Sequence, residues 1–279
     1  MAAGVDTVKE LRERTGAGIM DCKTALQASG GDMEKAIDFL RKKGMASAAK
    51  RAGREAKEGL VGIQISDKEA ILVEANCETD FVARTEDFKA LVILAIEETA
   101  SVGDKALASE KLAQRVAELS GKIGEKILVR RVKRVVTDHG IFFSYLHSNQ
   151  KLGVVIELIA KTASHKDLLF QELGKNLAMQ VAASNPLCLM RGEVPAAAIE
   201  REKAIYREEV KGKPDNIIEK ILTGKLEKFY QAHCLMEQLF IKDDKQSVDQ
   251  LIAQVSKNIG DNVQIKHFVR FQLGETITS

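Results

Sequence analysis

The most unusual grouping of charged and aromatic residues in this chain is Thr79-Asp80-Phe81-Val82. It follows an alternating apolar run typical of a β-strand and precedes a helical pattern. Thr79 is a good N-cap for that helix, and the helix dipole favours a carboxylate such as Asp80 in the first turn. The side chain of Phe81 has two possible orientations. Its apolar chemistry favours packing inward as a hydrophobic staple. Its position beside an acidic residue at a strand end favours projection into solvent as a wedge.

No catalytic signature accompanies this segment. The sequence has no phosphate-binding glycine motif and no G-x-S-x-G nucleophile motif. Its five histidines are never spaced i, i+3 or i, i+4, so a helical metal pair is not expected. We therefore predict no catalytic residues, no metal site and no cofactor, and hence a protein that is not an enzyme.

Composition narrows the classes of protein further. At 279 residues the chain is long enough for about two domains. The net charge of +2 does not favour general binding of nucleic acid or of a membrane surface. The four cysteines form no C-x-x-C pair, which favours free thiols in a reducing compartment. With no signal peptide and no apolar run of membrane length, we expect a cytoplasmic protein.

The first predicted domain, residues 1–55, is a bundle of three short amphipathic helices followed by a basic linker at 41–57. Ile19 and Met20 follow a Gly-Ala-Gly turn between the first two helices, and either fold back into the small core or form an exposed contact. The linker is either a solvated helix and tether or a contact with RNA or with an acidic partner surface. Because no aromatic residues are interleaved with its basic ones, the tether is favoured.

The remainder reads as an internal duplication of an α+β unit. Residues 56–140 have the predicted order β-β-α-α-β, and residues 141–279 repeat it. Between the two helices of the second half, residues 195–242 form two further amphipathic helical patterns joined by a short loop. This spacing predicts an inserted antiparallel helical hairpin.

Two blocks of this sequence resemble the signatures of the translation elongation factor Ts family. The first runs from Leu11 to Gly18 and continues through Leu26, and the second runs from Glu74 to Ala83. The resemblance implies a small bundle of the ubiquitin-associated type, a core of two related α+β halves, and a helical hairpin projecting from the second half. The predicted elements agree with that order.

The resemblance also implies a function as guanine-nucleotide exchange factor, with the GTPase elongation factor Tu as partner. In the family, the motif matching Thr79–Val82 enters near the partner's magnesium and GDP leaves. The position matching His147 supports the same surface, and the second core half meets the partner's barrel domain. A homodimer or a heterotetramer with the partner is compatible with this function. The bundle grips the partner's G domain, and its matching positions are Arg12, Ile19, Met20 and Lys23.

The sequence departs from the family pattern at two places, and it leaves one alternative function open. Ile19 stands where members commonly have Met, and the sequence stops soon after Glu275, without the C-terminal extension of some members. The alternative is an RNA-binding or ribosome-associated protein, against which the near-neutral net charge argues. Besides the linker, that alternative rests on a basic run in the strand predicted to close the first α+β unit, Arg130, Arg131, Lys133 and Arg134.

Overall fold

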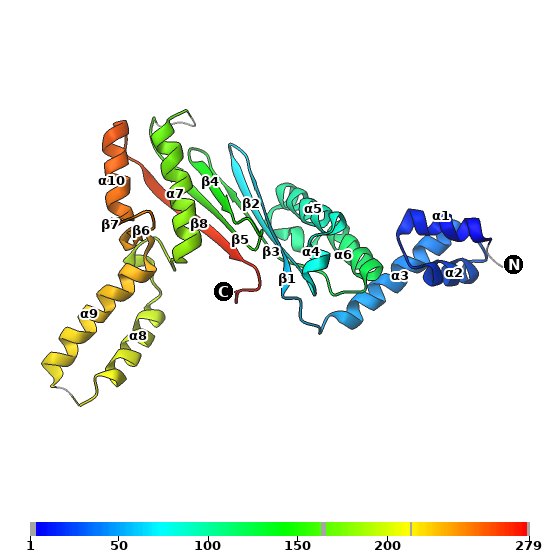
Figure 1. The fold of residues 1–279 in the computed structure, drawn as a ribbon, viewed down its shortest axis with the longest axis horizontal. Helices are drawn as coiled ribbons and strands as arrows, with labels where there is room; N and C mark the ends of the chain where they lie inside the picture. Colours follow the sequence, from blue (N-terminus) through cyan, green and yellow to red (C-terminus); the bar gives the residue numbers. More distant parts are fainter. Residues whose placement is uncertain (1–3, 163–165, 213, 278–279) are drawn as a thin grey trace.

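The computed structural model describes residues 4–162, 166–212 and 214–277. It confirms a mixed helix and sheet protein, with an N-terminal helical region and small antiparallel sheets (Figure 1). The helical region lies at one end of an elongated molecule, and a helical hairpin extends near the other end (Figure 1). The division into domains at 1–55, 56–140 and 141–279 stays a prediction.

The N-terminal region consists of helices α1 (Val5–Thr15), α2 (Ile19–Ala28) and α3 (Met33–Arg51). Their small core is built from apolar side chains at helical spacing, among them Leu11, Cys22, Ala25, Leu26 and Ala36.

Helix α3 is longer than the sequence pattern indicates, and most of the segment interpreted as a tether is its C-terminal half. This half packs on helix α6 (Glu110–Ile123), where the glycines at 44 and 121 allow a close approach. A Cβ at Gly121 would lie 3.2 Å from the Cα of Gly44. Arg51 also donates a hydrogen bond to the carbonyl of Ser120 at 3.2 Å. The segment is therefore helical up to Arg51, as the interpretation allowed, but it packs on α6 instead of lying free in solvent.

The first antiparallel sheet has the order β1 (Glu58–Ile65), β2 (Glu69–Cys77), β3 (Leu128–Val136). Helices α4 (Asp80–Ala83), α5 (Glu86–Val102) and α6 connect β2 to β3, with a 3₁₀ turn at Gly103–Ala108. Alternate residues of β2, Val73 and Ala75 among them, pack with the helices in one core cluster.

The second sheet has the order β4 (Ile141–Leu146), β5 (Leu152–Ile159), β8 (Gln264–Gln272), with α7 (Leu168–Ser184) and α10 (Val248–Ile259) on one face. Between α7 and α10 lie α8 (Ala196–Glu209) and α9 (Asp215–His233), which pack along each other. Between α9 and α10 lies a short hairpin, β6 (Leu239–Phe240) and β7 (Asp243–Ser247), which the sequence did not indicate because β7 is polar throughout.

The two sheets pack face to face, so the core has four layers: helices, sheet, sheet, helices (Figure 1). The layer between the sheets is apolar over most of its area, with Leu72, Phe142 and Val155 buried in it. A backbone hydrogen bond of 2.7 Å from Val61 to the carbonyl of Gln150 joins β1 to the β4–β5 turn.

A fully buried carboxylate, Glu74 of β2, interrupts this apolar layer. Opposite Glu74 and Ala75, strand β3 carries one extra residue, Arg130, which makes a β-bulge. Neighbouring residues of a regular strand point to opposite faces, but at the bulge both Arg130 and Arg131 reach Glu74, at 3.1 and 2.6 Å. The bulge thus provides two cations for one buried carboxylate.

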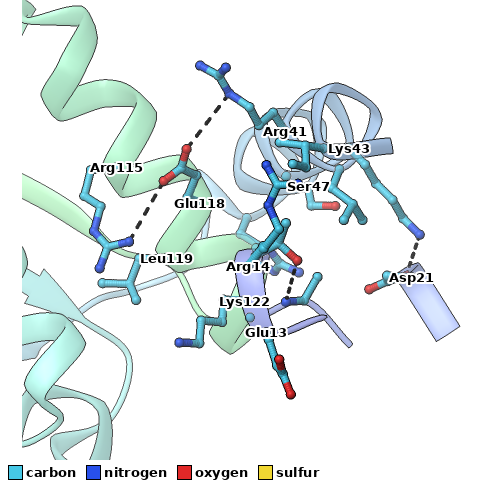
Figure 2. A pocket seen from close by; sticks show the side chains of 18 residues that line it. Glu13, Arg14, Asp21, Arg41, Lys43, Ser47, Arg115, Glu118, Leu119 and Lys122 are labelled. Carbon is cyan, nitrogen blue, oxygen red and sulfur yellow. Dashed lines mark hydrogen bonds and ion pairs between the residues drawn. The ribbon is translucent and has the colours of Figure 1, made fainter. Parts of the chain in front are cut away.

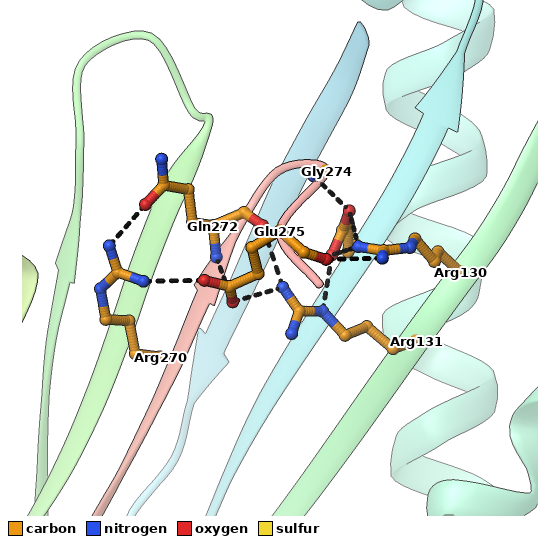
Figure 3. A network of polar contacts seen from close by, with 7 residues as sticks. Arg130, Arg131, Arg270, Gln272, Gly274 and Glu275 are labelled. Atoms are coloured by element: carbon orange, nitrogen blue, oxygen red, sulfur yellow. Dashed lines mark hydrogen bonds and ion pairs between the residues drawn. The ribbon is translucent and has the colours of Figure 1, made fainter. Parts of the chain in front are cut away.

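The same network ties down the end of the described chain (Figure 3). The backbone N–H of Gly274 donates to Glu74 at 2.9 Å. The carboxylate of Glu275 pairs with Arg131 at 2.7 Å and with Arg270 at 2.9 Å. A strand of the first sheet and the end of β8 in the second are therefore joined by charge as well as by apolar contact.

Strand β5 carries a matching carboxylate, Glu157, which is also fully buried. Strand β8 bulges opposite it, so that adjacent Lys266 and His267 both reach it, at 3.1 and 3.2 Å. Thr137 donates a further hydrogen bond to Glu157. Burial lowers the pKa of His267, which leaves Lys266 as the main positive charge at this site near neutral pH.

We expect Glu74→Gln to lower the free energy of unfolding by about 3 kcal/mol, because it leaves two partly buried arginines without their carboxylate. Urea unfolding followed by circular dichroism measures the change. Glu86→Gln is the control, since that side chain is 89% exposed and pairs only with Lys89, and it should leave the midpoint unchanged. Equal, small shifts in both variants would show that the Glu74 network does not stabilise the sheets.

Candidate functional site

The segment Thr79–Val82 forms the turn from β2 into the single-turn helix α4. Thr79 caps α4 as expected, accepting a hydrogen bond from the N–H of Val82 at 3.4 Å. Val82 and Ala83 are buried against the helical layer, whereas Phe81 is 79% exposed. Because neighbours on a helical turn point in different directions, burying Val82 and Ala83 turns Phe81 outward. The staple interpretation of Phe81 is therefore wrong.

Asp80 lies beside this exposed ring and pairs with Arg84, one helical turn later, at 2.8 Å. Both side chains are substantially exposed. An exposed pair of this kind contributes about 0–1 kcal/mol, so a competing cation can displace Arg84 at little cost. The end of β2 thus presents an aromatic ring and an available carboxylate side by side.

Sequence reasoning missed the residue that fixes the backbone of this segment, Glu125. Its carboxylate accepts hydrogen bonds from the N–H groups of Glu78 and Thr79, at 3.1 and 3.0 Å, and from the hydroxyl of Thr79 at 2.7 Å. Glu125 follows the glycine that ends α6. These bonds join residues 46 and 47 positions apart, so no local spacing in the sequence could have revealed them.

Two ionisable groups of the loop are strongly influenced by their surroundings. The pKa of Glu78 is lowered, first by a hydrogen bond from the N–H of Lys126 at 2.6 Å and then by Arg54. Burial, with the nearby carboxylates of Glu125 and Glu58, raises the pKa of Cys77 to about 12. Cys77 therefore remains a protonated thiol that donates to the carbonyl of Thr79, and it is not a nucleophile.

His147 lies in the turn between β4 and β5, exposed, with Nδ1 2.8 Å from the hydroxyl of Tyr145. That turn packs on β1, because Lys151 forms an ion pair with Glu58. Glu58 in turn pairs with Cys77 in the β1–β2 ladder. The fold therefore brings His147 to the same end of the sheets as Thr79–Val82.

The four candidate residues of the bundle belong to a separate part of the molecule (Figure 1). Ile19 and Met20 begin α2 and are 54% and 70% exposed, so the interpretation of them as core residues is wrong. Arg12 and Lys23 are also exposed. Two apolar and two basic side chains are thus available to a partner, at a distance along the molecule from Phe81.

A cavity of about 380 Å³ lies between the bundle and α6 (Figure 2). Of its charged side chains, Arg41 of the bundle contacts Glu118 of α6 across the seam. Glu118 also contacts Arg115 within α6, and Lys43 pairs with Asp21 within the bundle at 2.6 Å. The contact of Arg41 with Glu118 makes the cavity part of the junction between the two regions, and both Arg41 and Lys43 belong to the segment interpreted as a linker.

The basic run of β3 is not a free patch either. Besides the two arginines that bind Glu74, Lys133 pairs with Asp104 at 2.8 Å and Arg134 with Glu69 at 2.7 Å. These ion pairs weaken one of the two observations on which the RNA-binding alternative rested. Within the described parts of the chain, no cluster of three or more potential ligand side chains could hold a metal ion, and no helix is long and apolar enough to cross a membrane.

Comparison with known proteins places these features in one family. The family model described as Elongation factor TS matches residues 78–275. An Elongation factor Ts from Nitratidesulfovibrio vulgaris (strain DP4) is 46% identical over 281 residues, covering 99% of this chain and 97% of its own. Those of Prosthecochloris aestuarii and Clostridium kluyveri are 44% and 42% identical, covering 96% and 97% of this chain and 97% and 92% of their own. The chain therefore belongs to the elongation factor Ts family.

Proposed function

We propose that this chain binds elongation factor Tu and promotes release of GDP by inserting Thr79–Val82 near the magnesium ion of the partner's nucleotide site. Nucleotide exchange on elongation factor Tu is the role of the elongation factor Ts family, and it involves no chemical reaction. The proposal places the protein in the cytoplasm, where elongation of protein synthesis takes place.

One observation carries the mechanism: the outward Phe81 beside an available Asp80 carboxylate on a turn anchored at both ends. An exposed ring contributes little to the fold and is free to bury itself in a partner. The carboxylate can compete for the coordination of a divalent cation, which prefers oxygen ligands. Anchoring by Glu125 on one side and Val82 on the other limits the entropy lost when the loop is bound.

Thermodynamic linkage explains how binding at this loop would release nucleotide. A factor that binds the empty partner more tightly than the GDP-bound partner must weaken GDP binding by the same ratio. Magnesium neutralises phosphate charge, so disturbing its coordination removes much of the nucleotide's affinity. Each tenfold loosening requires about 1.4 kcal/mol of differential binding, which a buried aromatic ring and one carboxylate are able to supply.

The remaining parts would provide affinity and orientation. We infer that the bundle grips the partner's G domain through the exposed side chains Arg12, Ile19, Met20 and Lys23. His147 would support the surface next to the loop, and the second sheet half would meet the barrel domain. A homodimer or a heterotetramer with the partner stays a prediction, which light scattering of the chain alone and with elongation factor Tu would test.

We also infer that the two sheet halves are related by duplication and that the bundle is of the ubiquitin-associated type. The support for duplication is that Glu74 and Glu157 each occupy the sixth position of a central strand, opposite a bulge that supplies two adjacent basic residues. Such a repeated, unusual detail is what a copied unit would retain.

Phe81→Ala should lower the stimulated release rate of fluorescent GDP at least tenfold while leaving the thermal midpoint unchanged, because the ring is exposed. Phe88→Ala is the matched control: that ring is fully buried, and its loss should cost about 3–5 kcal/mol of unfolding free energy. Stopped-flow release and melting curves provide the two measurements. Normal exchange by a fully folded Phe81→Ala protein would refute the proposed mechanism.

Asp80→Asn should slow release several-fold, because it removes the charge near the partner's magnesium while leaving the Thr79 cap intact. Arg84→Ala is the control, since it removes only the surface partner of Asp80 and should not slow release. The effects of Asp80→Asn and Phe81→Ala should be less than additive, because both act on one event. Strict additivity in the double mutant would indicate two independent roles.

A further inference from the structure

The carboxylate of Glu125 is positioned to control the shape of the Thr79–Val82 loop. Three hydrogen bonds converge on it, two from consecutive backbone N–H groups and one from the Thr79 hydroxyl. Hydrogen bonds to a charged acceptor are stronger than those between neutral groups. Glu125 therefore binds the backbone N–H groups of the two residues that precede Asp80.

The hydroxyl of Thr79 passes this constraint on to α4. Because its proton is donated to Glu125, its oxygen lone pair is left to accept the N–H of Val82. The cap of α4 and the orientation of the turn before it are thus set by one carboxylate, and Phe81 lies between the two anchored points.

The contact is reciprocal. Glu78, whose N–H binds Glu125, accepts a hydrogen bond from the N–H of Lys126 through its own carboxylate at 2.6 Å. Each of two glutamates therefore binds the backbone beside the other, and the loop after β2 is joined to the segment after α6 in both directions.

We propose that Glu125 is a positioning residue for nucleotide exchange, holding Phe81 and Asp80 in the geometry that acts on the partner. This inference rests on the proposed function of the loop. Glu125 acts through hydrogen bonds to the loop backbone, so its loss affects the maximum release rate rather than the concentration of elongation factor Tu needed for half-saturation.

The test compares Glu125→Ala, Glu125→Gln and Glu118→Ala in stopped-flow release of fluorescent GDP from elongation factor Tu. Glu125→Ala should lower the maximum rate about tenfold with little change in half-saturation. Glu125→Gln should be intermediate, since one oxygen still accepts from the backbone while the Thr79 hydroxyl loses its acceptor. Glu118→Ala is the matched control: it lies in α6, the helix that precedes Glu125, contacts the bundle instead of the loop, and should keep the maximum rate.

Hydrogen exchange gives a readout independent of activity. In Glu125→Ala the peptide containing Glu78 and Thr79 should exchange at least tenfold faster than in wild type, while strand β5 stays protected. In the Phe81→Ala background, Glu125→Ala should cause little further loss of rate, because it acts through the ring's position.

Each result decides between the proposals. A normal maximum rate in Glu125→Ala, with Phe81→Ala impaired, overturns the positioning role and leaves the proposed function intact. Normal exchange by Phe81→Ala overturns the proposed function itself. If Glu125→Ala does not fold, Glu125→Gln decides: an intermediate rate with a loosened loop supports the inference, and a wild-type rate overturns it.

Discussion

In the layer between the two sheets, the carboxylate of Glu74 is shielded from solvent and neutralised by two arginines of the neighbouring strand. A buried charge without such partners costs several kcal/mol. Only the bulged register of β3 puts two adjacent basic side chains on the same face. The need to neutralise Glu74 therefore favours this pairing of β2 with β3 over registers shifted by one residue. In the second sheet, the bulge of β8 likewise brings two adjacent residues to the buried Glu157, of which Lys266 is the main cation.

The register of the strands also determines which residues meet at the candidate site. A defined register of β1 against β2 places Glu58 beside Cys77, at the strand end from which the loop departs. Lys151 then draws the β4–β5 turn, and His147 with it, to the same end. Contact between the sheets therefore assembles a surface from segments of both halves, which neither half could present alone.

Within the Thr79–Val82 loop, some residues are held rigidly and their neighbours are exposed to solvent. Thr79 and Val82 are held by hydrogen bonds and burial, whereas Phe81 is left in solvent and Asp80 has only a weak surface partner. An exposed aromatic ring is unfavourable for solubility and adds little to stability. Its presence on an anchored turn is understandable if the ring is buried only in a complex.

The sequence by itself determined the elements whose signals are local. Amphipathic periodicity indicated the bundle, alternation indicated the sheets, and Thr79 was predicted as a cap because capping involves residues three apart. The two signature blocks identified the family. The inserted helices were also evident, since their apolar spacing is continuous within each.

Only the tertiary structure decided which way ambiguous side chains point. Phe81, Ile19 and Met20 are apolar residues beside turns, and whether such residues are buried depends on what the rest of the chain covers. The extension of α3 to Arg51 depends on α6, and the roles of Glu125 and of the bulge at Arg130 depend on strands and loops distant in sequence. These outcomes arise from long-range packing and charge neutralisation, which leave no periodic signal in the sequence.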